Sequence, residues 1–282
     1  MDAILAVDEL VRPMTDQTLE AALQNPYLLD VLLGLSAQHL AVLYPSQADY
    51  YHHQATQLQT RGLSRFNQAR DDISGEKSIP MFLFASTLGH QLLCDSLRSC
   101  RDDFDSYLGQ FAWYLEIHRG VSTVTNCSWK TIRESGVKTF VQFLEAAKPT
   151  TEAPEIDTLH CMLDQSNLSP VSLQACRQAT ETLRNSFHIY RSILKRSIHT
   201  SASVTSFGAC VTTDFIDVLK QRRPEALVIL AFYAVLLHWC RNFWIFSDAG
   251  QFMIRSIAAR LGDHGSKWLA FPLSVLEMEQ TG

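Results

Sequence analysis

Ala226-Leu-Val-Ile-Leu-Ala-Phe-Tyr-Ala-Val-Leu-Leu237 is a run of twelve residues without a single charged or polar-amide side chain. It is about half as long as a membrane-spanning helix, and His238, Arg241 and Asn242 follow it at once. Pro224 precedes the run and suits the first turn of a helix. We therefore predict a buried core helix from Pro224 to about Phe246, with no membrane span.

The rest of the chain also follows a helical period, and no convincing strand alternation is seen. Thr15-Asp16 is expected to open a first segment that Pro26 interrupts. Polar loops are expected at 71–78 and 199–206, and the Pro- and Thr-rich stretch 148–155 is the clearest candidate for a linker. Further helices are expected at 28–43, 46–69, 80–97, 103–124, 129–147, 155–165, 171–197, 207–220, 252–261 and 266–278.

These patterns predict an all-α fold of about ten helices in one large domain covering residues 1–282. Composition agrees, because 46% of the 282 residues are hydrophobic, which is too many for a disordered chain. Only 12 Gly and 9 Pro are present, fewer than a β-sandwich or barrel needs for its turns. The formal charge of −5 argues against a protein that mainly grips nucleic-acid phosphates.

Cysteines and acidic residues give no sign of a metal or cofactor site. The seven Cys are odd in number and lack C-x-x-C spacing, so we expect core thiols in an intracellular protein. No signal peptide is seen at the start of the chain. His52 and His53 are adjacent, and on a helix they cannot chelate one metal together. Asp102, Asp103 and Asp105 are explained by a helix start, where carboxylates are stabilising.

One group of residues at the end of the apolar run is more suggestive, although no standard catalytic motif occurs in the chain. His238, Arg241, Trp244 and Asp248 are three or four residues apart and share one stripe if the helix runs that far. Aromatic residues lie around them. An apolar pocket with a few polar groups suits a lipophilic ligand carrying one hydroxyl or carboxyl. The alternative is that the aromatic side chains are core and the polar ones close the end of the helix.

Several stretches resemble the regulatory domain of fungal zinc-cluster transcription factors. Residues 25–45 (NPYLLDVLLGLSAQHLAVLYP) resemble its opening helix, residues 50–59 the next helix, and residues 111–129 the region that follows. The run Arg223–His238, followed by Trp268-Leu-Ala-Phe-Pro272, is most similar to the C-terminal module of the sterol uptake control proteins.

This resemblance implies an all-helical fold with an apolar C-terminal ligand pocket and a sterol that holds the protein inactive. Loss of the sterol would release such a protein from the cytoplasm to the nucleus. The resemblance places the expected pocket on the matching C-terminal run. Its expected residues are Phe232, Leu236, Trp239, Phe243 and Trp244, with the loop from Asp248 to Gly250. His238 and Arg241 are expected at the polar end of this pocket.

The sequence differs from the family at its N-terminus. These factors bind DNA through an N-terminal six-cysteine zinc cluster, whereas the first Cys in this sequence is Cys94. Either the sequence is a fragment of such a factor or it is a stand-alone regulatory domain, and we favour the second. We expect a regulator, for example in secondary metabolism, that does not bind DNA directly and acts as a homodimer or as a heterodimer with a zinc-cluster factor. The alternative function is a biosynthetic enzyme on a lipophilic intermediate, with His238 as acid or base, Arg241 as oxyanion clamp and Asp248 beside them.

Overall fold

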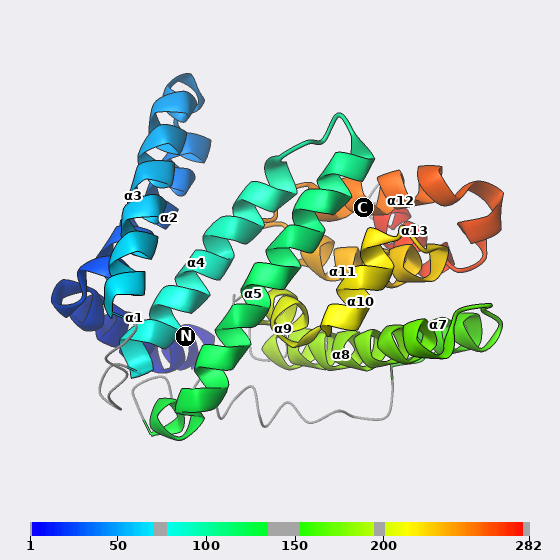
Figure 1. Ribbon diagram of the computed structural model, residues 1–282, viewed down its shortest axis with the longest axis horizontal. Helices are drawn as coiled ribbons and strands as arrows, with labels where there is room; N and C mark the ends of the chain where they lie inside the picture. Colours follow the sequence, from blue (N-terminus) through cyan, green and yellow to red (C-terminus); the bar gives the residue numbers. More distant parts are fainter. Residues whose placement is uncertain (1, 70–77, 135–152, 195–200, 279–282) are drawn as a thin grey trace. The chain divides into compact units, whose positions relative to one another are not determined.

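The computed structural model describes residues 2–69, 78–134, 153–194 and 201–278, and this part of the chain contains twelve α-helices and no strand (Figure 1). The predicted all-α class is confirmed. The helices are α1 (Asp2–Gln24), α2 (Pro26–Leu43), α3 (Ala48–Ala69), α4 (Ser78–Arg98), α5 (Phe104–Arg133), α7 (Pro154–Asp164), α8 (Pro170–Leu194), α9 (Ala202–Cys210), α10 (Thr213–Lys220), α11 (Pro224–Trp239), α12 (Ala249–Ser266) and α13 (Ala270–Glu277), with a short 3₁₀ helix at Pro45–Gln47.

The chain divides into two compact units. Among the described residues, unit 1 contains α1, α2, α3 and most of α4, together with residues 120–134. Unit 2 contains residues 95–119, 153–194 and 201–278. The single domain over 1–282 stays a prediction.

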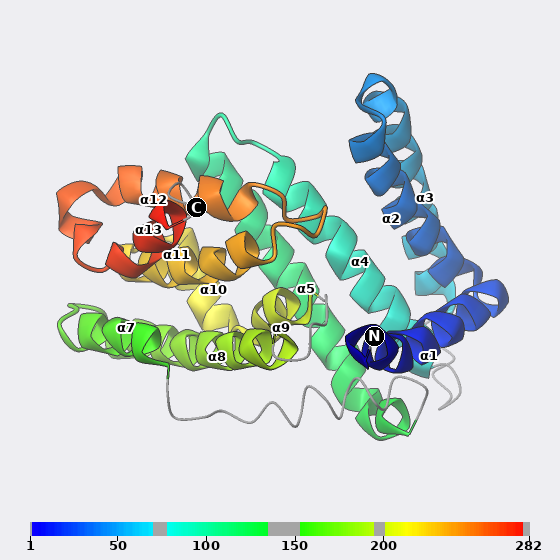
Figure 2. The same ribbon diagram turned by 180° about the vertical axis from the view of Figure 1, so that it is seen from behind.

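Unit 1 is built around the hairpin of α2 and α3, which lie side by side in both views (Figures 1 and 2). Pro26 occupies the first turn of α2, and the helix ends before Pro45, which starts the 3₁₀ turn. Tyr27, Phe66 and Phe84 pack as an aromatic core, with ring centroids 4.3–5.6 Å apart. This core anchors α2 and α3 on α4.

A buried carboxylate ties the hairpin together. Asp30 of α2 is only 2% exposed, and it accepts hydrogen bonds from Arg61 and Arg65 of α3. The pair of Asp30 with Arg61 is bidentate in form, at 2.6–3.1 Å. One charge on α2 is thereby matched by two on α3.

Unit 2 is built around α11, and the prediction of a buried core helix is confirmed. Every residue from Ala226 to His238 is buried. The helices α8, α9, α10, α12 and α13 all contact α11. A helix apolar on every side can be stable only when other helices cover all of its faces, which is the arrangement found here.

The prediction that this helix runs to Phe246 is wrong, because α11 ends at Trp239. Residues 240–248 instead form turns through hydrogen bonds such as Phe243 N to Cys240 O and Phe246 N to Phe243 O, both 2.9 Å. No Gly or Pro marks this end. The Trp244 carbonyl, within these turns, accepts a hydrogen bond from Arg98 at 2.9 Å.

Other predicted boundaries also differ. Of the loop expected at 199–206, residues 199 and 200 lie outside the described residues and residues 202–206 lie within α9. The expected helix 207–220 is divided at Val211 and Thr212 into α9 and α10. The helix α5 runs through the predicted break at Ser128, and α1 begins well before Thr15. Residues 71–77 of the loop expected at 71–78 lie outside the described residues, and Ser78 begins α4. Residues 148–152 of the expected linker also lie outside the described residues. Of the remaining linker residues, Ala153 is buried and Pro154 opens α7.

The cysteines differ in exposure, and α2 is unusually apolar. Cys94 and Cys176 are buried as expected for core thiols, whereas Cys100, Cys161 and Cys210 are exposed. In the described part, α2 is the only helix long and apolar enough to cross a membrane. Less than half of it is buried, and one such helix near the N-terminus is a weak indication, since core helices have the same composition.

Candidate ligand-binding site

The predicted site residues separate into two groups because the chain turns after Trp239. Phe232, Leu236, His238 and Trp239 belong to α11, and Phe243, Trp244 and Asp248 belong to the turns that follow it. The single stripe of His238, Arg241, Trp244 and Asp248 is therefore not formed.

An aromatic cluster surrounds the end of α11. Trp239 stacks on Tyr190 of α8, with centroids 4.9 Å apart and an interplanar angle of 23°. Phe187 of α8 and Phe271 of α13 meet the same indole edge-on, at 5.5 and 6.3 Å. Phe232 is fully buried and lies 5.5 Å from the Phe271 ring. We call these five residues the aromatic cluster; Tyr190, Trp239 and Phe271 are partly exposed.

A set of small polar side chains lies beside this cluster. Ser186 of α8 shares a 2.9 Å hydrogen bond with Ser206 of α9, and Ser203 lies 3.8 Å from the Cys240 sulfur. Ser186 and Ser203 are fully buried. Burial raises the pKa of Cys240, so its thiol is neutral. These four residues, the hydroxyl cluster, form an uncharged polar patch, and two of them, Ser186 and Cys240, are chain neighbours of Phe187 and Trp239.

A hydrogen bond between Arg241 and the His238 backbone closes the end of α11. His238 is 4% exposed, and its carbonyl accepts a hydrogen bond from Arg241 Nη1 at 3.0 Å. Arg241 is exposed. This contact is the helix-ending arrangement that the sequence left open as the alternative to a ligand site.

Trp244 and Asp248 face the turn between α4 and α5. The Arg98 guanidinium lies 5.9 Å from the centroid of the Trp244 ring. Arg101 Nη1 donates to both oxygens of Asp248 at 2.8 Å, and its guanidinium also lies over the Phe252 ring. Asp248 is thus paired with a cation 147 residues away in the chain, while Phe243, 38% exposed, packs on Phe246.

Gly250 and Leu236 are packing residues. A Cβ atom at position 250 would lie 2.4 Å from the His238 nitrogen and 2.5 Å from the Ala234 oxygen, so α12 crosses α11 in direct backbone contact. Leu236 is fully buried in the core.

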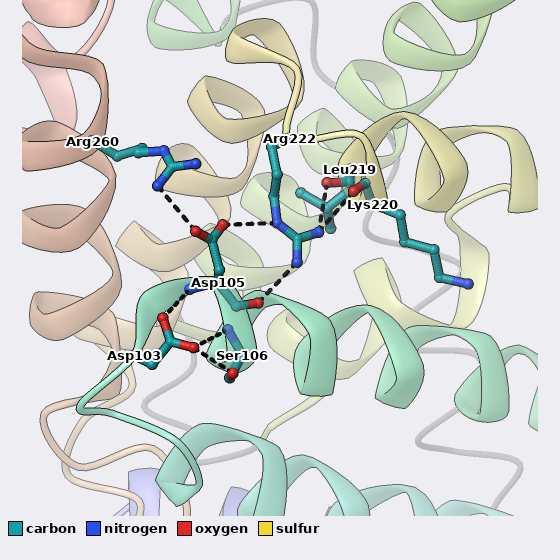
Figure 3. A network of polar contacts seen from close by, with 7 residues as sticks. All are labelled: Asp103, Asp105, Ser106, Leu219, Lys220, Arg222 and Arg260. Carbon is teal, nitrogen blue, oxygen red and sulfur yellow. Dashed lines mark hydrogen bonds and ion pairs between the residues drawn. The ribbon is translucent and has the colours of Figure 1, made fainter.

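The acidic cluster before α5 has a structural role, as expected (Figure 3). Asp103 accepts hydrogen bonds from the backbone of Asp105 and Ser106 and so caps the helix. Hydrogen bonds to Ser106 lower the pKa of Asp103. Asp105 pairs with Arg222 and Arg260 at 3.2 and 3.1 Å. Within the described residues, no group of three His, Cys, Asp or Glu is placed to hold a metal ion.

Sequence reasoning missed Phe187, Tyr190 and Phe271. The first two are spaced i, i+3 on α8, which is a recognisable pair on one helix face. Phe271 lies in the Trp268–Pro272 segment that the sequence had singled out.

Comparison with known proteins relates the chain to transcription factors. It is 25% identical over 272 residues to a Gibberella zeae protein described as a Zn(2)-C6 fungal-type transcription factor. The alignment covers 90% of this chain and 54% of that protein, so the chain spans about half the length of this relative. No family model and no solved structure matches the chain.

Proposed function

We propose that this protein is a ligand-responsive regulator of transcription whose ligand is a lipophilic, sterol- or terpenoid-like small molecule. The observation that carries the proposal is the similarity to a zinc-cluster transcription factor along 90% of the chain. The aromatic cluster supplies the ligand-binding surface, and nuclear and cytoplasmic localisation follows from the proposed role.

The chemistry of the aromatic cluster supports a rigid apolar ligand. Trp239, Tyr190 and Phe271 are partly exposed aromatic side chains that pack on one another, and Arg241 is the nearby cation. Burial raises the pKa of Tyr190, and the Arg241 charge opposes this shift, so the phenol is neutral; Cys240 of the hydroxyl cluster is also near Tyr190. A ligand lying on the rings could therefore hydrogen-bond one hydroxyl to Tyr190 or to the hydroxyl cluster.

The proposal assigns DNA binding to a partner. The formal charge of −5 supports this assignment, because domains that hold DNA by themselves are usually basic. A zinc-cluster factor that dimerises with this chain would supply the basic surface.

A reporter assay tests the regulatory role. The chain is fused to an unrelated DNA-binding domain in a fungal strain carrying the matching reporter gene, and sterol synthesis is then inhibited. We expect the reporter signal to rise several-fold on sterol depletion. Trp239→Ala should remove the response, whereas Trp244→Ala, outside the aromatic cluster, should keep it. A reporter signal indifferent to sterol supply in the unaltered protein would contradict the proposal.

A further inference from the structure

The outer face of α2 carries no charged side chain, although it is partly exposed. Asp30 is the only Asp, Glu, Lys or Arg between Pro26 and Leu43, and it is buried on the inner face against Arg61 and Arg65. A helix on the surface of a soluble protein normally turns charged residues outward. An uncharged outer face is typical of a helix that another chain covers.

The residues of this face form one straight stripe. The buried side chains of α2 lie on one side of the helix, and the side chains of 29, 32, 36, 40 and 43 point the opposite way, since they are three or four residues apart. Leu43 is 56% exposed, and Ser36 is also exposed. The remaining members, Leu29, Leu32 and Leu40, are partly exposed. Leu33, at 46%, flanks the stripe.

The spacing of the stripe is the same in both directions from its centre. The steps from Leu29 to Leu32, Ser36, Leu40 and Leu43 are three, four, four and three residues. If a second α2 lies antiparallel, with a two-fold axis at Ser36, Leu29 meets Leu43 of the other copy and Leu32 meets Leu40. All four leucines then face leucines.

We propose that a second copy of this chain packs against α2, antiparallel and centred on Ser36. A symmetric dimer needs a surface that is complementary to itself. This stripe meets that condition, because its leucines face leucines and no like charges are brought together. The small Ser36 permits close approach at the axis. Its hydroxyl already donates to the Leu32 carbonyl at 2.9 Å, so little polar desolvation opposes contact.

The proposal does not depend on the ligand or on the regulatory role. An 18-residue helix is about 27 Å long, so the two helices alone make a small interface. We therefore expect a reversible dimer that forms in the micromolar concentration range. The flanking Leu33 would face His39 of the other copy.

Analytical ultracentrifugation of the full chain tests the dimer over a series of concentrations. The unaltered protein should move from 31.8 kDa towards twice that mass as concentration rises. Ser36→Glu and Ser36→Lys should each stay monomeric, because residue 36 faces itself across the axis and like charges repel. A mixture of the two variants should dimerise again. Ser64→Glu, on the exposed side of α3, is the matched control and should dimerise normally.

Three outcomes would overturn the proposal. One is an unaltered protein that stays monomeric throughout the concentration series. The second is a dimer that Ser36→Glu leaves intact, which would place the interface elsewhere. The third is a failure of the mixed variants to associate, which would contradict the two-fold axis at Ser36. Circular dichroism confirms that each variant retains its helix content.

Discussion

Gly250 of α12 lies directly against the backbone of His238 in α11, where an added Cβ would come within 2.4 Å of the His238 nitrogen. The contact is between backbones, so no flexible side chain can move aside. It sets how closely α12 approaches the core helix at the point where α11 ends. The turns that carry Trp244 and Asp248 connect these two helices and depend on the same crossing.

Gly250→Ala should therefore destabilise the protein. We expect a loss of about 1–3 kcal/mol in the free energy of unfolding, as for other overpacked contacts, measured by urea denaturation. Gly109→Ala in α5 is the control, because the nearest atom to its Cβ is 3.9 Å away. That control should be neutral or stabilise by up to about 1 kcal/mol. Equal losses in both variants would show that the backbone contact at Gly250 has no special role.

Thr212 should stabilise the start of α10. Its Oγ1 accepts a hydrogen bond from the Phe215 backbone N at 3.3 Å. Thr212→Ala should lower the free energy of unfolding by about 0.5–2 kcal/mol. Thr212→Ser keeps the hydroxyl and should recover most of the loss; if it is as unstable as the Ala variant, the cap is not the cause.

Asp30 should contribute more to the free energy of unfolding than an exposed carboxylate does. Asp30→Asn removes a buried charge that two guanidiniums contact, and we expect a loss of about 1.5–3 kcal/mol, towards the lower end because both Arg side chains are half-exposed. Asp248→Asn, whose side chain is 62% exposed, should cost less than about 1 kcal/mol. Urea denaturation compares the two variants, and a larger effect at Asp248 would reverse this ranking.

Acid should weaken the fold before the carboxylates titrate. Burial lowers the pKa of His90 below its usual 6.5, partly offset by a hydrogen bond to the Ser86 carbonyl. The unfolded chain then takes up a proton first as pH falls, so stability is constant above about pH 6.5 and declines below it. Denaturation at pH 7, 6 and 5 measures the decline, and His90→Asn should reduce its slope. A slope unchanged by this substitution would mean that His90 does not contribute.

The sequence predicted the core helix well, because α11 is apolar on all sides and begins at a proline. It could not predict where the helix ends, since no Gly or Pro directly follows Trp239. The turns after it are joined to a residue distant in sequence, because Arg98 donates to the Trp244 carbonyl across 146 positions. The division at Val211 and Thr212 did have a local signal, a Thr followed by Asp214, which is typical of a helix start.

The candidate site was predicted only in part, because it also depends on contacts between residues that are distant in sequence. Phe232 and Trp239 do lie in one aromatic cluster, but their partners come from α8 and α13, which periodicity cannot place in space. Asp248 pairs with Arg101, and nothing in the local sequence indicates that contact. Spacing along a helix predicted a shared stripe only as far as the helix itself continued.

Binding of a fluorescent sterol to the purified chain tests the central claim most directly. We predict saturable binding by the unaltered protein, at least about tenfold weaker binding by Trp239→Ala, and little change in Trp244→Ala. Trp239→Phe, which keeps an aromatic ring, should retain more affinity than Trp239→Ala. The absence of saturable binding, or equal affinity in the unaltered protein and Trp239→Ala, would contradict the assignment of the aromatic cluster as a ligand site.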